Sequence, residues 1–408
     1  MKRNFYFRWL RVILCLGSLM LFAVSCDEII TETWEAVYPV NTDNIPEFVC
    51  ETSDGNILSG GGIRSNSDYS PSVCAIVMTD SHGTMLWTKT FDQVRNIYAN
   101  SPIMAREVSN GCLVAYLDYD NLSVNLTLLD MNGEHIDAWS FPTSFVRVRA
   151  FQLTEESILI SGWTVCDRYD ANNPSQCIMY SNQSTALFSL NGDMLWACDD
   201  ASNVITATRD GGAAIVTEFS DSDNDTVHYG VVNKINASGE REWATTVKTG
   251  ALIFSDYCTP KFIRENETGG FVYAAYYGPV YEMRLGTMVS TLASTGRVVR
   301  SVYSNDQFIK GLRENPGGGY IITGYVSTTY SLVDDLVIDG IYVRKLTSGL
   351  SVDWNQEFIA TGTDPWKMSY DACETQDGGY VVSGSKTTAN YWLMKTDSLG
   401  RIDVAAEP

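Results

Sequence analysis

The stretch Asp377-Gly378-Gly379-Tyr380-Val381-Val382-Ser383-Gly384 joins a glycine turn to an apolar run, and Asp397-Ser398-Leu399-Gly400 adds a second glycine turn. An earlier copy, Asp80-Ser81-His82-Gly83-Thr84-Met85-Leu86-Trp87, shows that the second turn leads into a run that carries a tryptophan. Glycine supplies the positive φ that tight hairpin turns need. Each unit is therefore predicted to hold four short strands, a to d, with tight turns between a and b and between c and d.

The unit recurs along the whole chain. Its last glycine falls at seven positions, namely Gly83, Gly133, Gly192, Gly239, Gly296, Gly349 and Gly400. A repeat of roughly 45–60 residues with four short strands is typical of a propeller blade. Runs such as 73–78 are apolar on both faces, as expected for a sheet packed between two neighbours. The sequence predicts an all-β, seven-bladed β-propeller of four-stranded antiparallel blades.

The two ends of the chain bear on how this ring closes. The last unit stops at 404–408 without a strand d, and 33–38 resembles the strand at 87–91 that carries Trp87. We expect this N-terminal strand to complete the last blade, which would remove the exposed sheet edges. The alternative is a tether that begins to fold only near Phe48.

Tryptophans follow most of the second turns and are predicted to pack between blades. They are Trp87, Trp139, Trp196, Trp243 and Trp354. The fifth unit has Arg300 at this position.

The N-terminus reads as a targeting signal. Basic residues within the first eleven positions precede an apolar run, 12–24, that is too short to span a bilayer. The run ends in Leu21-Phe22-Ala23-Val24-Ser25-Cys26, which resembles the lipobox of bacterial lipoproteins. That resemblance implies cleavage before Cys26 and lipid attachment to its sulfur. The alternative is an ordinary secretory peptide with an incidental cysteine.

The residues after the lipobox bear on location. Asp27 and Glu28 are similar to the export signal of surface lipoproteins in Bacteroidota, whereas in enteric bacteria this aspartate would indicate inner-membrane retention. We expect a signal peptide at 1–25, a tether at 26–32 and one propeller domain at 33–408. The expected location is the bacterial outer membrane, with the protein surface-exposed or facing the periplasm.

The Asp-Gly-Gly-aromatic unit resembles propeller repeats common in secreted proteins and lipoproteins of Bacteroidota, and it covers nearly the whole mature chain. Such repeats specify a fold and leave the function open. The second turn is also similar to the tryptophan-docking repeat of quinoprotein propellers. Those enzymes usually have eight blades and an adjacent-cysteine pair, whereas this chain has seven copies and no Cys-Cys. No cofactor is predicted.

The net charge and the cysteines exclude some kinds of ligand and predict one disulfide. A formal net charge of −21 argues against nucleic acid, whose phosphates need a basic surface. Cys166 and Cys177 bracket a polar stretch and are the predicted disulfide in an oxidising envelope. Cys50 and Cys373 occupy matching positions in two units and are predicted to be free core residues. The cysteine spacing predicts no metal site.

Catalytic signals are sparse. The three histidines, His82, His135 and His228, form no recognisable triad pattern with a serine or cysteine. The run 221–225 alternates acidic residues like a calcium loop but has Val232 where an acidic twelfth residue is needed, so a solvated hairpin tip is predicted. Carboxylates are plentiful, and nothing selects a pair. The sequence leaves enzymatic activity open and favours its absence.

The variable connections lie between strands b and c, at 164–183 in the third unit, in the fifth unit, and at 325–340 in the sixth. Insertions on one face usually mark the binding face, and tyrosine suits contact with a glycan or a protein. The candidates are Tyr169, Tyr180, Tyr276, Tyr277, Tyr281, Arg284, Tyr325 and Tyr330. In the alternative interpretation these tyrosines fold back over their own loops.

The expected function is a lipid-anchored, monomeric binding or scaffolding module for a glycan or protein. The alternatives are an envelope glycan hydrolase or lyase that uses carboxylates in the central funnel, and a scaffold for outer-membrane assembly.

Overall fold

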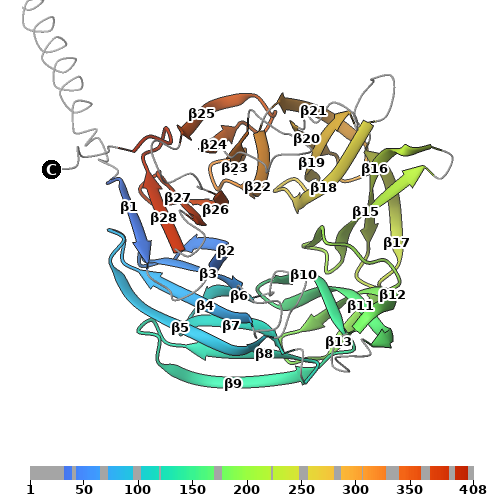
Figure 1. Ribbon diagram of the computed structural model, residues 1–408, viewed down its shortest axis with the longest axis horizontal. Helices are drawn as coiled ribbons and strands as arrows, with labels where there is room; N and C mark the ends of the chain where they lie inside the picture. Colours follow the sequence, from blue (N-terminus) through green and yellow to red (C-terminus); the bar gives the residue numbers. More distant parts are fainter. Residues whose placement is uncertain are drawn as a thin grey trace, which may run out of the picture.

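The computed structural model describes residues 32–38, 43–64, 72–94, 103–118, 121–169, 177–221, 224–247, 256–279, 286–305, 307–327, 340–359, 368–385 and 391–402. These residues form seven four-stranded antiparallel sheets arranged around a central axis (Figure 1). The predicted seven-bladed β-propeller is confirmed. Within the same ranges, no helix has the length and apolar character to cross a membrane.

The blades follow the order of the chain. Blade 1 holds β2 (Asp43–Glu51), β3 (Ile57–Arg64), β4 (Ser72–Thr79) and β5 (Met85–Val94). Blade 2 holds β6 (Ile103–Val108), β7 (Gly111–Asp118), β8 (Ser123–Leu129) and β9 (His135–Pro142), and blade 3 holds β10 (Arg147–Leu153), β11 (Ser157–Tyr169), β12 (Cys177–Ser189) and β13 (Met194–Cys198). Blade 4 holds β14 (Ile205–Ala207), β15 (Ala213–Asp221), β16 (Asn224–Ile235) and β17 (Arg241–Val247).

The second half of the ring repeats the arrangement. Blade 5 holds β18 (Asp256–Glu265), β19 (Phe271–Pro279), β20 (Gly286–Leu292) and β21 (Val298–Asn305). Blade 6 holds β22 (Gln307–Glu314), β23 (Tyr320–Val326), β24 (Gly340–Leu346) and β25 (Val352–Ile359). Blade 7 holds β26 (Met368–Glu374), β27 (Tyr380–Ser385) and β28 (Tyr391–Thr396), and its fourth strand is β1 (Trp34–Tyr38).

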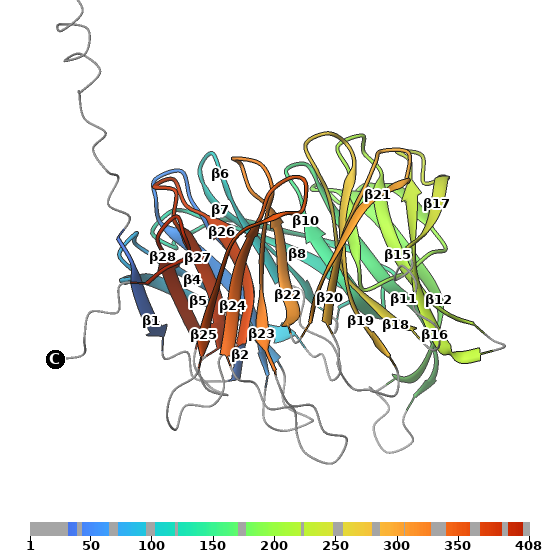
Figure 2. The same cartoon turned by 90° about the horizontal axis from the view of Figure 1, so that it is seen from above.

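Antiparallel pairing gives the disc two different faces, which lie above and below the strands in the edge-on view of Figure 2. The a–b and c–d turns lie together on one face, which we call the turn face. The b–c and d–a connections lie on the other, the loop face. Turn glycines such as Gly83 (φ 81°) and Gly378 (φ 80°) have the positive φ that the sequence predicted.

The N-terminal strand closes the ring. Strand β1 pairs with β28 from Trp34↔Lys395 to Tyr38↔Tyr391. The Trp34 indole donates a hydrogen bond to the Ser81 carbonyl (2.7 Å), and the Tyr38 hydroxyl donates to the Gly83 carbonyl (2.6 Å). Both acceptors belong to the c–d turn of blade 1, so the first strand joins the last blade to the first. Closure by this strand is confirmed, and the alternative of a tether up to Phe48 is wrong.

Equivalent tryptophans dock most blades onto the next, with blade 5 as the exception. Trp87, for example, donates to the Met131 carbonyl in the c–d turn of blade 2 (2.9 Å), and Trp243 donates to the Ser294 carbonyl of blade 5 (3.0 Å). Their rings lie against the turn glycine, since a Cβ on Gly133 would stand 2.8 Å from Trp87 and one on Gly296 2.6 Å from Trp243. The predicted inter-blade packing of these residues is confirmed.

Blade 6 departs from the predicted pattern at its second turn. The residue with positive φ is Leu350 (φ 61°) and not Gly349, and its N–H bonds the Thr347 carbonyl as Gly83 bonds Asp80. The preceding blade carries Arg300 where an indole would stand. Because no ring covers this turn, there is room for the Leu350 side chain, which is 2% exposed.

The aspartate of the Asp-Gly-Gly motif has a structural role. In blade 7, Asp377 accepts from the Thr375 hydroxyl (2.6 Å) and pairs with the buried Lys395 ammonium (2.7 Å). Burial alone would raise the pKa of Asp377, but the bond from Lys395 and the other donors hold the pKa below its usual value. Asp210 and Lys234 repeat the pair in blade 4 at 2.7 Å. The motif that defines the repeat therefore stabilises the first hairpin.

Candidate functional site: the central channel

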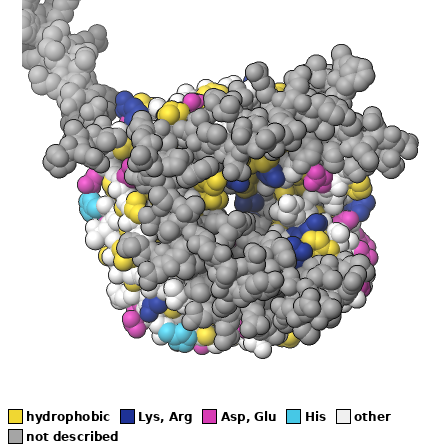
Figure 3. All heavy atoms as spheres, in the orientation of Figure 1, with side chains coloured by type: hydrophobic (Ala, Val, Ile, Leu, Met, Phe, Trp, Pro, Cys, Tyr) yellow, Lys and Arg dark blue, Asp and Glu magenta, His cyan; other side chains and the backbone are white. Residues whose placement is uncertain are grey.

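A cavity of about 690 Å³ lies on the propeller axis and is lined mainly by the a strands, the innermost strand of each blade. Its size falls within the range of small-molecule sites, roughly 300–1,000 Å³. In the space-filling view, lysine and arginine side chains gather in the hollow at the centre of the disc (Figure 3). We call this cavity the central channel.

Five of the a strands carry a β-bulge at an equivalent position. The ladders of β2, β10, β18, β22 and β26 with their b strands each shift by one residue. The extra residues are Glu47, Arg149, Lys261, Lys310 and Tyr370, and all five line the central channel. Bulges commonly re-aim a side chain beside a functional site. We call these five the bulge residues.

Three of the bulge residues are cations backed by an aromatic ring of their own blade. The Arg149 guanidinium lies 4.1 Å from the ring centre of Trp163 on β11. Likewise, the Lys261 ammonium lies 4.6 Å from Tyr276 on β19, and the Lys310 ammonium 5.6 Å from Tyr325 on β23. Cation–π contact favours the charged form of each side chain and limits its motion. Blades 3, 5 and 6 therefore each place a cation, packed on an aromatic ring, in the lining of the same channel.

The channel carries charges of both signs, and its cations outnumber by one the four carboxylates that line it. Five cations line it, because Arg264 and Arg313 join the three basic bulge residues. Burial lowers the pKa of Lys261, and the charge of Glu218 opposes this shift. Burial, reinforced by Arg147, also lowers the pKa of Arg149. Removal from water disfavours a charged group unless a counter-charge is supplied, and Glu218 supplies one to both Lys261 and Arg149.

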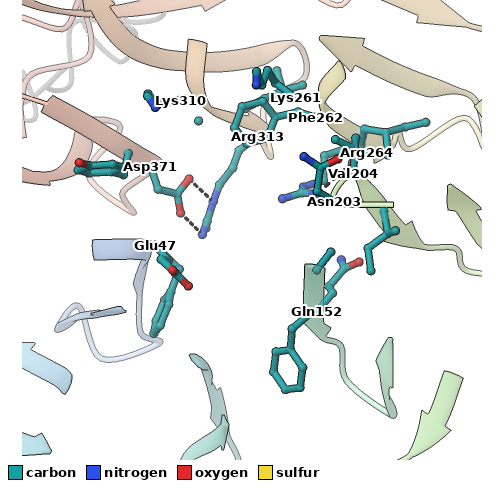
Figure 4. Close-up of a pocket in the computed structure, with 18 of the residues that line it drawn as sticks. Glu47, Gln152, Asn203, Val204, Lys261, Phe262, Arg264, Lys310, Arg313 and Asp371 are labelled. Atoms are coloured by element: carbon teal, nitrogen blue, oxygen red, sulfur yellow. Dashed lines mark hydrogen bonds and ion pairs between the residues drawn. The ribbon is translucent and has the colours of Figure 1, made fainter. Parts of the chain in front are cut away.

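Most of the channel carboxylates already serve the fold. Figure 4 shows Arg313 reaching across to Asp371 in a two-point ion pair, with Nε to Oδ1 at 3.0 Å, and Asp371 also accepts from the Val49 amide (3.0 Å). Burial alone would lower the pKa of Arg313, but Asp371 raises it above its usual value. At the turn face, Glu265 accepts from the Arg209 amide (2.8 Å) and Glu314 from the Glu267 amide (3.0 Å). These bonds tie neighbouring blades together.

Two of the predicted binding residues lie in strands beside the central channel. Tyr276 lies in β19, where its hydroxyl donates to the Ile309 carbonyl of blade 6 (2.7 Å), and Tyr325 lies in β23 with only 7% of its surface exposed. Both line the central channel. Their predicted place in a variable loop is wrong, because the b strands extend further toward the loop face than the apolar pattern indicated.

The remaining candidates are not gathered into one site. Tyr277 also lies in β19, and its hydroxyl donates to Asn305 (2.6 Å). Tyr169 and Tyr180 belong to the long hairpin of β11 and β12, so the predicted loop at 164–183 is mostly strand. The side chains of these two tyrosines lie outside the described residues, as do Tyr281, Arg284 and Tyr330 entirely.

The cysteines follow their predicted classes where the structure describes them. Cys50 and Cys373 are free, and burial raises the pKa of the Cys50 thiol to about 11, so it carries little reactive thiolate. Cys166 is in a disulfide bond. Its pairing with Cys177 stays a prediction, because the Cys177 side chain lies outside the described residues, although its backbone pairs with Tyr169. Cys26 also lies outside them.

The other chemical candidates stand apart from the channel. His82 lies in an exposed turn beside Glu32, with Nδ1 and Oε2 2.5 Å apart, and His135 begins β9 with its side chain exposed. The side chains of His228 and of the acidic tip at 221–225 are outside the described residues. In the described part of the chain no three metal-ligating side chains come together.

The basic bulge residues, Arg149, Lys261 and Lys310, were not predicted from the sequence. Arg149 stands between Val148 and Ala150, and Lys310 between Ile309 and Gly311. A cation recurring in the innermost strand of several units was the available signal. Its meaning depends on the bulge, which brings residues far apart in the sequence into one channel.

Comparison with known proteins finds similarity among solved structures alone. No family model matches the sequence, and no curated protein matches it. Among solved structures, the chain is similar to a protein of unknown function from Bacteroides caccae, at 12% identity and a TM-score of 0.37, covering 74% of this chain and 91% of that one. It is also similar to the β-propeller domain of the Trilobed protease from Pyrococcus furiosus, at 7% identity and a TM-score of 0.48, covering 90% and 98%.

Proposed function

We propose that this protein is a lipid-anchored binding module of the bacterial cell envelope. It takes a glycan or protein ligand at the loop face, and part of that ligand enters the central channel. The observation that carries the proposal is the convergence of the five bulge residues on one cavity. These five equivalent departures from regular pairing place polar side chains along the axis.

The position of β1 supports a definite orientation. Trp34 pairs with Lys395, next to the turn that follows β28, so the chain enters the propeller at the turn face. Eight Cα-to-Cα steps join Cys26 to Trp34, and an extended chain of that length reaches at most about 29 Å. A lipid on Cys26 would keep the turn face near the membrane and leave the loop face directed away from it, toward a ligand.

The channel favours binding over hydrolysis. Glycoside hydrolases mostly need two carboxylates placed on either side of the bond that breaks. Of the four carboxylates that line the channel, Asp371, Glu265 and Glu314 are held by Arg313 or by backbone amides of neighbouring blades. Among the residues that the structure describes, the channel therefore offers cations and aromatic rings for recognition, whereas three of its four carboxylates are held by the fold.

A blocking substitution tests the site. The full-length lipidated protein, displayed on vesicles, is exposed to a panel of fluorescent glycans and soluble envelope proteins. Asn203 is exposed and lines the channel, so Asn203→Trp should abolish binding of the selected ligand. Ser238→Trp, in an exposed turn of the turn face, is the matched control and should bind normally. Equal binding by both variants would place the ligand elsewhere and overturn the proposal.

A further inference from the structure

We propose that the cavity between blades 5 and 6 binds an aromatic carboxylate, a planar ring that bears an acidic group. The ring takes the place of a docking tryptophan that this interface lacks, and Arg300 receives the carboxylate. The cavity lies between β21 of blade 5 and the outer strands of blade 6, and it shares no lining residue with the central channel. The inference is therefore independent of the proposed function.

The interface between blades 5 and 6 interrupts the aromatic packing of the propeller. In the c–d turns of the other six blades an aromatic side chain lies against the turn glycine, in the pairs Trp34–Gly83, Trp87–Gly133, Phe141–Gly192, Trp196–Gly239, Trp243–Gly296 and Trp354–Gly400. Arg300 pairs with Thr291, two residues before the turn, and Trp243 has the same register in blade 4. The Arg300 guanidinium lies 3.8 Å from where a Cβ on Gly349 would stand. An arginine therefore faces the turn of blade 6 where the other turns meet a ring.

The cavity beside Arg300 has the size of a small aromatic ligand. It measures about 230 Å³, with the buried Leu350 in its wall. Val289 and Ile322, both 3% exposed, give it an apolar lining, and Tyr303 and Val352, 45% and 56% exposed, connect it to solvent. A cavity of about 150 Å³ is enough to hold benzene, whereas larger ligands occupy about 300–1,000 Å³. The volume fits a single ring, or an indole, with one small substituent.

The charged groups of the lining select an acidic ligand. Among the described residues that line the cavity, Arg300 and Arg344 are basic and none is an aspartate or a glutamate. Arg300 is exposed, and it makes no hydrogen bond or ion pair with the described part of the chain. Asp353, the next acidic residue along β25, acts on Lys345. A guanidinium binds a carboxylate through two parallel hydrogen bonds and also stacks on aromatic faces, so Arg300 suits both parts of the ligand.

A hydrogen-bond network holds Arg344 in the wall of the cavity. Its Nε donates to Asn355 Oδ1 (2.9 Å), and Glu357 Oε1 accepts from Asn355 (3.2 Å) and from Gln307 (2.8 Å). Burial lowers the pKa of Arg344, and the charge of Glu357 opposes this shift. Because Arg344 is already engaged by Asn355 and Glu357, Arg300 is the cation that a ligand pairs with.

Titration calorimetry on the full-length protein in detergent tests the inference, with the heat of adding each probe to detergent alone subtracted. Indole-3-acetate should bind at least about tenfold more tightly than indole-3-acetamide, which keeps the ring and lacks the charge. It should also bind more tightly than cyclohexylacetate, which keeps the charge and lacks the aromatic ring. The tripeptide Gly-Gly-Trp presents the same two groups at the end of a peptide. Whether it or indole-3-acetate binds more tightly identifies the source as a peptide or a free acid.

Matched variants locate the site. Arg300→Gln should weaken binding of indole-3-acetate by about tenfold, the loss expected for one charge-assisted hydrogen bond. Arg297→Gln removes an exposed cation of the same blade that does not line the cavity and should leave affinity unchanged. Arg300→Trp/Leu350→Gly rebuilds the ring-on-glycine pair of the other blades, so it should abolish binding. It should also unfold at a higher temperature than Leu350→Gly alone, because the new indole fills the gap.

Four results would overturn the inference. Equal affinity for indole-3-acetate and its amide would show a site for neutral rings, and equal affinity for cyclohexylacetate would show a site that does not select aromatic rings. Binding of no probe would leave the cavity without the proposed ligand. An affinity that is lost in Arg297→Gln and kept in Arg300→Gln would place the carboxylate elsewhere. Each of these results leaves the proposed function standing, because that function is tested at the central channel.

Discussion

Alanine at Gly83 probes the closure of the ring, because this glycine lies beneath Trp34 of the N-terminal strand. A Cβ at position 83 would stand 2.7 Å from the indole ring. Gly55 is a matched control in the same blade. Its φ is +83° against +81° for Gly83, and a Cβ there would meet nothing within 4 Å. The two substitutions therefore share the backbone strain and differ in the contact with Trp34.

The expected magnitudes follow from these two terms. A left-handed conformation costs a non-glycine residue about 1–2 kcal/mol, which is the loss expected for Gly55→Ala. Gly83→Ala adds an overpacked contact worth about 1–3 kcal/mol. Trp34→Ala, which removes a half-buried indole and its bond to Ser81, should cost about 3 kcal/mol, the lower end for large aromatic residues.

Urea unfolding of the four variants, including Trp34→Ala/Gly83→Ala, measures the coupling. In the absence of the indole, Gly83→Ala should cost no more than Gly55→Ala, which gives a coupling of about 1–3 kcal/mol between positions 34 and 83. Equal unfolding free energies for Gly83→Ala and Gly55→Ala in the wild-type background would refute the closure by β1.

Three further predictions concern separate parts of the chain. Cys26→Ser should release the protein from membranes or leave it unprocessed, and unchanged fractionation and lipid labelling would contradict the anchor. Peptide mapping without reductant should find Cys166 linked to Cys177, a ring that loop-entropy arguments value at roughly 3 kcal/mol, and free thiols at both positions would contradict it. Asp377→Asn leaves the buried Lys395 charge unpaired and should cost about 3–5 kcal/mol, whereas Asp54→Asn, in a motif where Met78 replaces the lysine, should cost less. The pKa of Asp377 is lowered in the folded protein, so the stability that Asp377 contributes is full above its unfolded pKa and is lost as the pH falls through its folded pKa. The wild-type protein should therefore lose stability below about pH 4 more steeply than Asp377→Asn. Acid unfolding monitored by circular dichroism measures this difference.

The fold was predictable because its signals are local and repeated. Tight turns need glycine at fixed places, and strand patterns between them repeat at each blade, so the blade count and the role of Trp34 follow from the sequence. In the second turn of blade 6 the residue with positive φ is Leu350, and the residue of blade 5 that faces this turn is Arg300 in place of a tryptophan. The sequence shows only that Gly349 lies one residue before the position that has the positive φ. The reason for the shift is a contact between two blades.

The candidate site was less predictable, because it is built from residues that no local pattern connects. A bulge adds one residue to a strand and leaves no periodic trace, so nothing in the sequence connects Arg149 with Lys261. The segment 164–183 was predicted to be a loop because it is long and polar, although β11 and β12 form a long hairpin there. A strand that extends past its neighbours can be as polar as a loop.

A crystal structure of the protein bound to the ligand selected in the vesicle assay would test the central claim most directly. The account predicts part of the ligand in the central channel, in contact with the bulge residues. A ligand bound on the turn face, or at the rim of the loop face with the channel empty, would contradict it.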